Sequence, residues 1–118
     1  MLYRILLRSL FAGVLAGALP SAGLAQEVVK VGLILPITGP FASTGRQIES
    51  AVRLYMQQNG TTVAGKKIEL IVKDDAGTPD TTRRLAQELV VNDKVQFLAG
   101  FGLTPTAFAT APIASVRT

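Results

Sequence analysis

Three apolar segments, each followed by a stretch with helical periodicity, constrain the fold of this 118-residue chain more than any other feature. The first segment, residues 28–35, is typical of a buried parallel strand because Lys30 is its only charged residue. We expect two further strands at 68–73 and 95–99. The order β-α-β-α-β-α, with connections long enough for right-handed crossovers, predicts a three-layer α/β fold around a doubly wound parallel sheet.

The first helix is predicted from about Arg46 to Gln58. Ser43 or Thr44 is its expected N-cap, and Asn59-Gly60 ends it because both residues tolerate the left-handed backbone conformation. Apolar residues at helical spacing predict one buried face on this helix, made of Ile48, Ala51, Val52, Tyr55 and Met56.

The second helix begins with a recognisable cap. Thr78 is the expected N-cap, and Pro79 fits the first helical position, where a missing N–H costs nothing. Between the first helix and the second strand, we expect residues 61–67 to form a polar connection that turns at Gly65. Thr104-Pro105 repeats the cap-and-proline start for a third helix.

The composition argues against an enzyme, because the chain contains no His and no Cys. The adjacent acids Asp74 and Asp75 close a strand before a helix, and turn and helix-dipole preferences explain them better than acid/base or metal chemistry. Gly100-Phe101-Gly102 begins a dinucleotide-binding pattern, but Pro105 stands where its last glycine belongs. We therefore expect no catalytic residue, no metal site and no cofactor.

The first 25 residues have the pattern of a secretory signal peptide. Arg4 and Arg8 precede an apolar run at 10–19, and Gly23-Leu24-Ala25 supplies the small residues of a cleavage site. The run is shorter than the ~20 residues that a membrane span needs. We expect residues 1–25 to be removed during export of the remainder by the general secretory route. Loss of the two arginines lowers the net charge by two from +4, a balance that does not indicate nucleic-acid binding.

A ligand site is expected at the carboxyl ends of the first and third strands, where the strand order reverses. Two loops border this point, residues 36–45 and 100–105. Both lead into helix N-termini, which favour an anionic group such as a carboxylate or phosphate. The loops carry the candidate binding residues: hydroxyl groups on Ser43, Thr44 and Thr104, and apolar side chains on Phe41, Phe101 and Leu103.

In order and spacing, these motifs resemble the N-terminal part of periplasmic leucine/isoleucine/valine-type substrate-binding proteins of ABC transporters, which have the type I periplasmic binding fold. The resemblance covers Val28 to Thr118. It is carried by Val31–Pro36, Thr38–Pro40, Gly45, Lys73–Asp75, Pro79, Ala99–Gly100 and Ala111–Ala114.

The resemblance implies two α/β lobes, joined by a hinge, that close on an amino acid or another small carboxylate or amide. It places the Thr104 hydroxyl on the ligand's carboxylate, helped by the backbone around Gly102 and Leu103. It also places Thr44 beside the ligand, where amino-acid binders are expected to have an aromatic residue. The class further includes binders of amides, urea and aromatic acids.

On this resemblance, residues 26–118 form the N-terminal part of the first lobe, and the second lobe lies beyond this chain. The whole protein is expected to capture branched-chain or related amino acids, or small amides and carboxylates, and to deliver them to an ABC permease. A single incomplete lobe is expected to bind such a ligand weakly or not at all. The alternative within the same fold is a ligand-sensing receptor domain for amides or amino acids.

Overall fold

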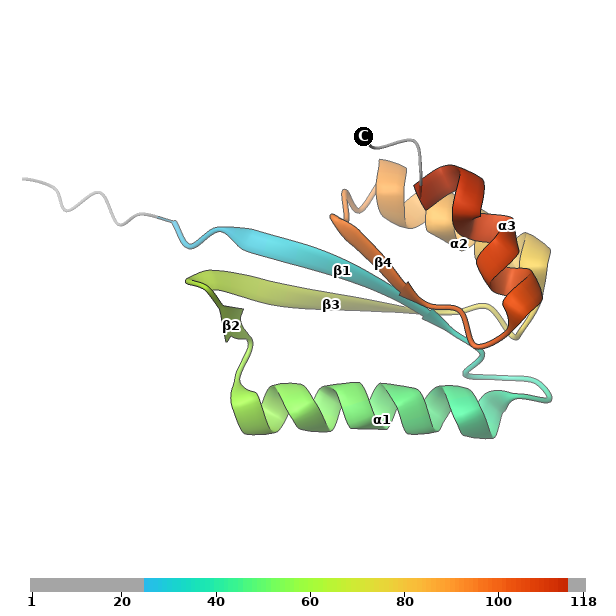
Figure 1. The fold of residues 1–118 in the computed structure, drawn as a ribbon, viewed down its shortest axis with the longest axis horizontal. Helices are drawn as coiled ribbons and strands as arrows, with labels where there is room; N and C mark the ends of the chain where they lie inside the picture. Colours follow the sequence, from blue (N-terminus) through green and yellow to red (C-terminus); the bar gives the residue numbers. More distant parts are fainter. Residues whose placement is uncertain (1–24, 115–118) are drawn as a thin grey trace, which may run out of the picture.

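The computed structural model describes residues 25–114, so the expected signal peptide lies outside the described residues apart from Ala25. Four strands and three helices follow one another along this part of the chain (Figure 1). In order they are β1 (Val28–Leu35), α1 (Ala42–Asn59), β2 (Thr62–Val63), β3 (Lys66–Asp74), α2 (Pro79–Val91), β4 (Phe97–Gly100) and α3 (Thr104–Ala114).

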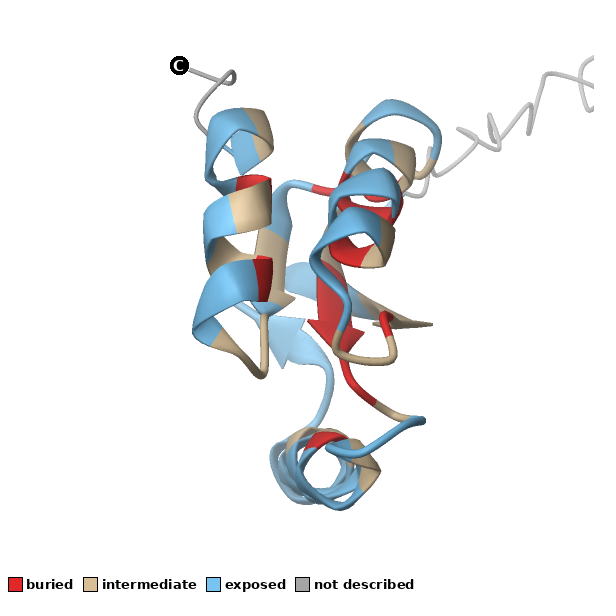
Figure 2. Cartoon of the chain, turned by 90° about the vertical axis from the view of Figure 1, so that its right-hand side faces the viewer, coloured by how far each residue is buried: buried red, intermediate tan, exposed pale blue. Residues whose placement is uncertain are grey.

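The strands form one sheet in the order β2-β3-β1-β4. β1 lies in the middle and pairs in parallel with both neighbours, Val28–Leu35 with residues 67–74 and Val31–Ile34 with residues 97–100. Helix α1 covers one face of the sheet, and α2 and α3 lie side by side on the other (Figures 1 and 2). The predicted doubly wound α/β architecture, with the first strand between the other two long ones, is confirmed.

A short hairpin replaces the polar connection predicted at residues 61–67. β2 pairs antiparallel with the start of β3, with Val63 opposite Lys66. The two residues between them, Ala64 and Gly65, have φ values of 49° and 77°. Positive φ at both central positions is typical of the hairpin turn that suits the twist of the strands. The prediction missed this hairpin because alanine, and not the usual Asn, Asp or Gly, occupies the first turn position.

The predicted start of α1 is also wrong. The helix begins at Ala42 with Phe41 as its N-cap, so Ser43 and Thr44 lie inside its first turn. A tight turn at Gly39 (φ 78°) causes the early start, since the Ala42 amide already donates to the Gly39 carbonyl over 3.2 Å. The predicted end is confirmed, because the helix stops at Asn59 and Gly60 follows with φ 81°.

The apolar face predicted for α1 is only partly buried. Val52 and Met56 are half-buried, whereas Ile48 and Ala51 are exposed. Tyr55 is 67% exposed, so its predicted place in the core is wrong. The predicted face is wider than the strip that the described part of the sheet covers. The helix contacts the sheet mainly through β1.

The main core lies between the sheet and the two helices on its other face. Figure 2 shows the buried residues gathered on β1 and on the inner side of α2. Gly32 of β1 allows this close packing, because a methyl group at that position would lie 2.8 Å from Leu89 Cδ1. The cluster consists of Ile34, Leu85, Ala86, Leu89 and Val95.

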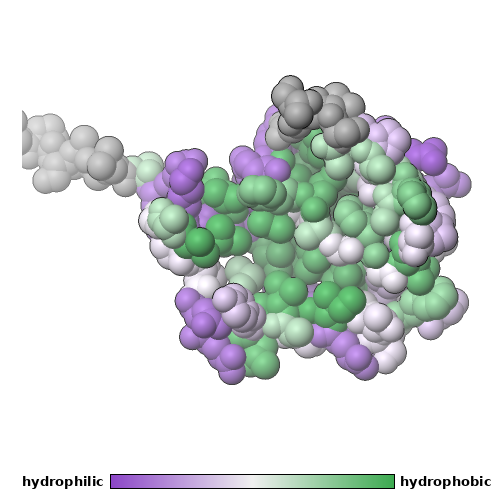
Figure 3. Space-filling view, viewed as in Figure 1, coloured by the Kyte–Doolittle hydropathy of each residue, from purple (hydrophilic) through white to green (hydrophobic). Residues whose placement is uncertain are grey.

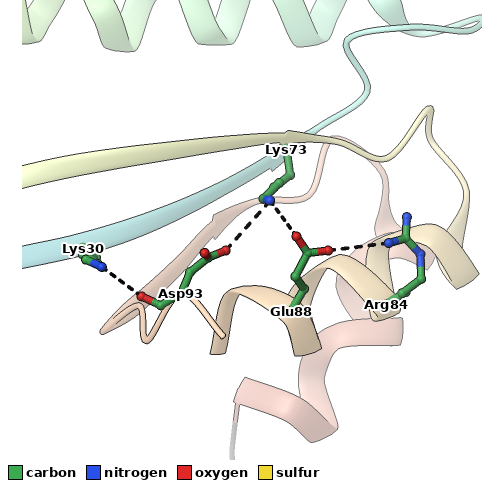
Figure 4. A network of polar contacts seen from close by, with 5 residues as sticks. All are labelled: Lys30, Lys73, Arg84, Glu88 and Asp93. Carbon is green, nitrogen blue, oxygen red and sulfur yellow. Dashed lines mark hydrogen bonds and ion pairs between the residues drawn. The ribbon is translucent and has the colours of Figure 1, made fainter. Parts of the chain in front are cut away.

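A chain of charges ties α2 to the strands outside this core (Figure 4). Lys73 of β3 donates a 2.7 Å hydrogen bond to Glu88, which also pairs with Arg84 at 3.6 Å. The bond raises the pKa of Lys73 and lowers the pKa of Glu88. Beyond the helix, Lys73 lies 3.9 Å from the Asp93 carboxylate, and Lys30 of β1 donates to the Asp93 carbonyl. The network fixes the end of α2 over β1 and β3.

The β4 edge of the sheet is open in the part of the chain that the structure describes. Hydrophobic residues gather over the strands at the centre of the face shown in Figure 3. Phe97 of β4 and Phe108 of α3 are 61% and 73% exposed. No helix among residues 25–114 is both long and apolar enough to cross a membrane.

Candidate ligand-binding site

The two predicted loops meet at Pro36, the buried residue that follows β1. A methyl group at Gly102 would lie 2.8 Å from Pro36 Cδ, so the β4–α3 loop packs directly on this ring. A methyl group at Gly45 would lie 2.1 Å from the Pro36 carbonyl oxygen, so the first turn of α1 packs on the backbone of the same residue. The structure therefore brings the two loops together, as predicted for the point where the strand order reverses.

The chain leaves β4 through a strained turn. Gly100 has φ 103° and passes so close to β1 that a methyl group there would lie 2.2 Å from the Ile34 carbonyl oxygen. The next residue, Phe101, also has a positive φ of 62°, and its amide donates to that same carbonyl over 2.8 Å. The half-buried Phe101 side chain packs against the core cluster. It therefore supports the loop from the core side, and its expected part in lining the ligand site stays a prediction.

The start of α3 offers backbone donors at the expected place. Leu103 accepts hydrogen bonds from the amide of Thr106 (3.1 Å) and from its hydroxyl (2.7 Å), which fixes the first turn. The amides of Gly102 and Leu103 find no acceptor among residues 25–114. Free amides at the positive end of a helix suit a carboxylate oxygen. The exposed Thr104 hydroxyl lies in this same turn.

Ser43 and Thr44 are exposed in the first turn of α1. Ser43 accepts a 3.3 Å hydrogen bond from the Gln47 side chain. The Thr44 amide donates to the Phe41 carbonyl over 3.1 Å, and the exposed Thr44 side chain lies at the surface. Both residues lie on the α1 side of the strand ends, and Thr104 lies on the α3 side.

A third loop, to which the prediction gave no part in the site, lies beside the other two. A methyl group at Gly77, in the turn between β3 and α2, would lie 3.3 Å from both Phe41 Cδ2 and Leu103 Cδ1. Phe41 and Leu103, predicted from separate loops, therefore lie over the same point, and we call this pair the apolar wall. Gly77 could have been found from the sheet order, since β3 borders β1 and its exit loop must lie beside that of β1.

Asp74, the last residue of β3, joins this third loop to the first. Its Oδ1 accepts hydrogen bonds from the amides of Ile37 (2.8 Å), Thr38 (3.2 Å) and Ala76 (2.9 Å). Its Oδ2 accepts one from the Thr38 hydroxyl over 2.6 Å. Partial burial would raise the pKa of Asp74, but the hydrogen bonds from Thr38, Ala76 and Ile37 outweigh it and lower the pKa to about 2. The interpretation of Asp74 as a turn-forming acid agrees with these contacts.

Replacing Gly77 with alanine is expected to disturb the apolar wall, and Gly65→Ala supplies a matched control. Both glycines have nearly the same φ, 73° and 77°, so each change costs about 1 kcal/mol in backbone strain. Only at Gly77 does the added methyl group meet other side chains. NMR should show shifted Phe41 and Leu103 side-chain resonances in Gly77→Ala and unchanged ones in Gly65→Ala. Identical spectra for the two variants would contradict the packing described.

A family model described as periplasmic binding protein matches residues 28–117. The chain belongs to this family. Its members are solute-binding proteins and not enzymes, in agreement with the expectation from the composition. The predicted type I periplasmic binding fold is likewise confirmed, since the similar solved structures are solute-binding proteins of ABC transporters.

Three similar proteins illustrate the family. The "Leu/Ile/Val-binding protein homolog 6" of Brucella abortus (strain 2308) is 43% identical over 88 residues, which are 74% of this chain and 23% of the relative. A solute-binding protein of an ABC transporter from Rhodopseudomonas palustris BisB5, in complex with 3,4-dihydroxybenzoic acid, is 64% identical with a TM-score of 0.73, covering 74% of this chain and 24% of that one.

The third, from Rhodopseudomonas palustris HaA2 and in complex with p-hydroxybenzoic acid, is 37% identical with a TM-score of 0.71. That match covers 75% of this chain and 24% of the solved one. This member of the periplasmic binding protein family thus spans about a quarter of the length of the relatives it matches.

Proposed function

We propose that this protein serves as the solute-binding component of an ABC importer and that its loops hold the carboxylate of an aromatic hydroxy acid. The observation that carries the ligand class is the 64% identity to a solute-binding protein in complex with 3,4-dihydroxybenzoic acid. Branched-chain amino acids are the second candidate ligands, because the curated relatives are named as Leu/Ile/Val-binding proteins.

The geometry of the strand ends supports an aromatic acid. The free amides of Gly102 and Leu103 suit a carboxylate at the start of α3. Phe41 and Leu103 come together above Gly77 and supply an apolar surface for a ring. In this proposal, the hydroxyls of Thr44 and Thr104 border the ligand from the two sides of the site.

Family membership also supports action in the periplasm, with an ABC permease as the partner that receives the ligand. The predicted signal peptide at residues 1–25 would direct the chain there. The described residues supply one side of a cleft, so this chain is expected to bind its ligand with only millimolar affinity. Closure of a second lobe would exclude water from the other side.

The test is expression of the whole chain in a bacterial host, followed by purification from the periplasm and NMR titration. Mass spectrometry should give a mature chain that begins at Gln26. Millimolar 3,4-dihydroxybenzoate should shift the amide resonances of residues 41–44 and 102–104. Catechol, which has the same ring without the carboxylate, serves as the matched control and should leave the Gly102 amide resonance unchanged.

Leucine is the second ligand in the same titration. If leucine shifts the resonances of residues 102–104 more than 3,4-dihydroxybenzoate does, the ligand is an amino acid and not an aromatic acid. Absence of any shift with either compound at millimolar concentration would overturn the proposed function.

A further inference from the structure

The hydrogen bonds of Asp74 cross between two loops that lie far apart in the sequence. Three of its four bonds go to the β1–α1 loop, to the Ile37 amide and to the amide and hydroxyl of Thr38, 36 or 37 residues away. The fourth goes to the amide of Ala76 in its own turn. One carboxylate thus holds the start of one loop against the start of the other.

A second contact joins the β1–α1 loop to the β3–α2 turn, at the junction that we call the seam. Gly39 has φ 78°, and a methyl group there would lie 3.2 Å from the Ala76 carbonyl oxygen. The β1–α1 loop therefore lies flat on the β3–α2 turn for the three residues from Ile37 to Gly39. Directly beyond this seam, Phe41 packs on Gly77 of the same turn.

We propose that Asp74 is a positioning residue that fixes the β1–α1 loop on the β3–α2 turn and so places Phe41 in the ligand-binding wall. The effect of Asp74 on ligand binding rests on the proposed function, whereas its effect on the position of the β1–α1 loop does not. The Asp74 carboxylate itself points to the loop backbone and does not contact the ligand.

This assignment explains why an acid, and not a neutral acceptor, stands at this place. Four donors converge on two carboxylate oxygens. An asparagine offers one carbonyl oxygen and carries two N–H donors of its own, so it would face the Thr38 hydroxyl or the amides with the wrong group. Hydrogen bonds to an ionised group are also about twice as strong as neutral ones.

The test compares Asp74→Asn with Asp80→Asn, an acid in the first turn of α2 whose side chain is 98% exposed. In Asp74→Asn, hydrogen exchange at the Thr38 amide should be at least tenfold faster, while protection in β1 and α2 stays as in the wild type. Exchange at the Ile37 amide should rise less, because this amide also donates to the Leu35 carbonyl over 3.0 Å. In Asp80→Asn, exchange at both loop amides should not change. Unchanged loop protection in Asp74→Asn would overturn the proposal.

A pair of Thr38 variants decides the question if Asp74→Asn fails to fold. Thr38→Ser keeps the hydroxyl that donates to Asp74 over 2.6 Å, and Thr38→Val removes it with little change in shape. Loop protection should be retained in Thr38→Ser and lowered in Thr38→Val. Equal protection in the two variants would contradict the role given to Asp74.

A ligand readout separates this proposal from the proposed function. With millimolar 3,4-dihydroxybenzoate, Asp74→Asn should lose the shifts at residues 41–44 and keep those at 102–104. If the wild type shows no ligand response but Asp74→Asn loosens the loop, the proposed function fails and the positioning role stands. If the loop stays protected in Asp74→Asn, the positioning role fails whatever the ligand does.

Discussion

Replacing Gly45 with alanine is expected to destabilise the protein by about 3 kcal/mol, although helix propensity alone predicts the opposite sign. Gly45 lies in the first turn of α1, and alanine is favoured over glycine inside a helix by about 1 kcal/mol. The added methyl group, however, would lie 2.1 Å from the Pro36 carbonyl oxygen and 2.6 Å from its carbon. Both are backbone atoms of a buried residue, so the whole first turn must move away.

The measurement is urea denaturation of the purified chain, with Ser50→Ala as the control in the same helix. Ser50 is exposed, so its replacement by alanine should leave stability unchanged or raise it by a few tenths of a kcal/mol. Gly45→Ala should also shift the amide resonances of residues 41–44, because the first turn of α1 carries them. A Gly45→Ala variant as stable as the wild type would show that α1 does not pack on Pro36 in solution.

Pro36 explains why this glycine matters for the site as well as for stability. Gly45 from α1 packs on the carbonyl group of this proline, and Gly102 from the β4–α3 loop packs on its ring. A change that displaces either neighbour alters the distance between the two loops. The residue that sets the width of the proposed site is therefore buried beneath it and carries no functional group.

Much of this fold is predictable because it is specified locally. The continuous apolar run at 28–35 identifies the central strand, and Asn59-Gly60 marks the end of α1. Thr78 and Pro79 stand at the N-cap and first position of α2, as predicted. Each of these signals depends on a few adjacent residues whose backbone preferences agree with the final structure.

The three errors have separate causes, two of them local and one set by the sheet. Ser43 and Thr44 are good N-cap residues, but the turn at Gly39 starts α1 before them. Tyr55 has the spacing of a core residue, yet the width of the sheet decides whether it is covered. The hairpin at Ala64 could not be recognised in the sequence, because alanine rarely adopts the positive φ that this turn requires.

The candidate site also has one part that the sequence predicts and one part that it does not. Phe41 and Leu103 could be placed near each other from the strand order, since both loops leave the sheet where that order reverses. The same strand order places the β3–α2 turn beside the loop after β1, but the hydrogen bonds that Asp74 makes between them could not be predicted in this way. An acid after a strand signals a turn, but which loop its side chain reaches depends on the pairing of β1 with β3.

Replacing Asp75 with alanine should have the second large effect, a loss of about 3 kcal/mol in unfolding free energy. Asp75 is fully buried. Its carboxylate accepts a 2.8 Å hydrogen bond from the Gly77 amide and a 2.7 Å bond from the Thr82 hydroxyl. Alanine would leave the Gly77 amide without its acceptor, and the Thr82 hydroxyl would keep only its bond to the Thr78 carbonyl. Thermal or urea unfolding measures the loss.

Two further variants, Asp75→Asn and Asp80→Ala, provide comparisons for the loss of unfolding free energy in Asp75→Ala. The asparagine keeps one acceptor oxygen, so its cost should fall between those of the wild type and Asp75→Ala. Asp80 lies in the first turn of the same helix, but its side chain is 98% exposed and its pair with Arg83 is 4.0 Å long. Its loss should cost less than 1 kcal/mol. Equal costs for Asp75→Ala and Asp80→Ala would contradict a buried anchor at this place.

The contrast between Asp75 and its neighbour Asp74 follows from strand geometry. Successive side chains at the end of a strand point to opposite faces of the sheet. Asp74 bonds the loop that leads into α1, and Asp75 bonds the start of α2 on the other face. We therefore expect Asp74→Asn to loosen one loop while the core persists. Asp75→Ala should instead release α2, whose Leu85 and Leu89 belong to the core cluster, and so lower the protection of the whole sheet.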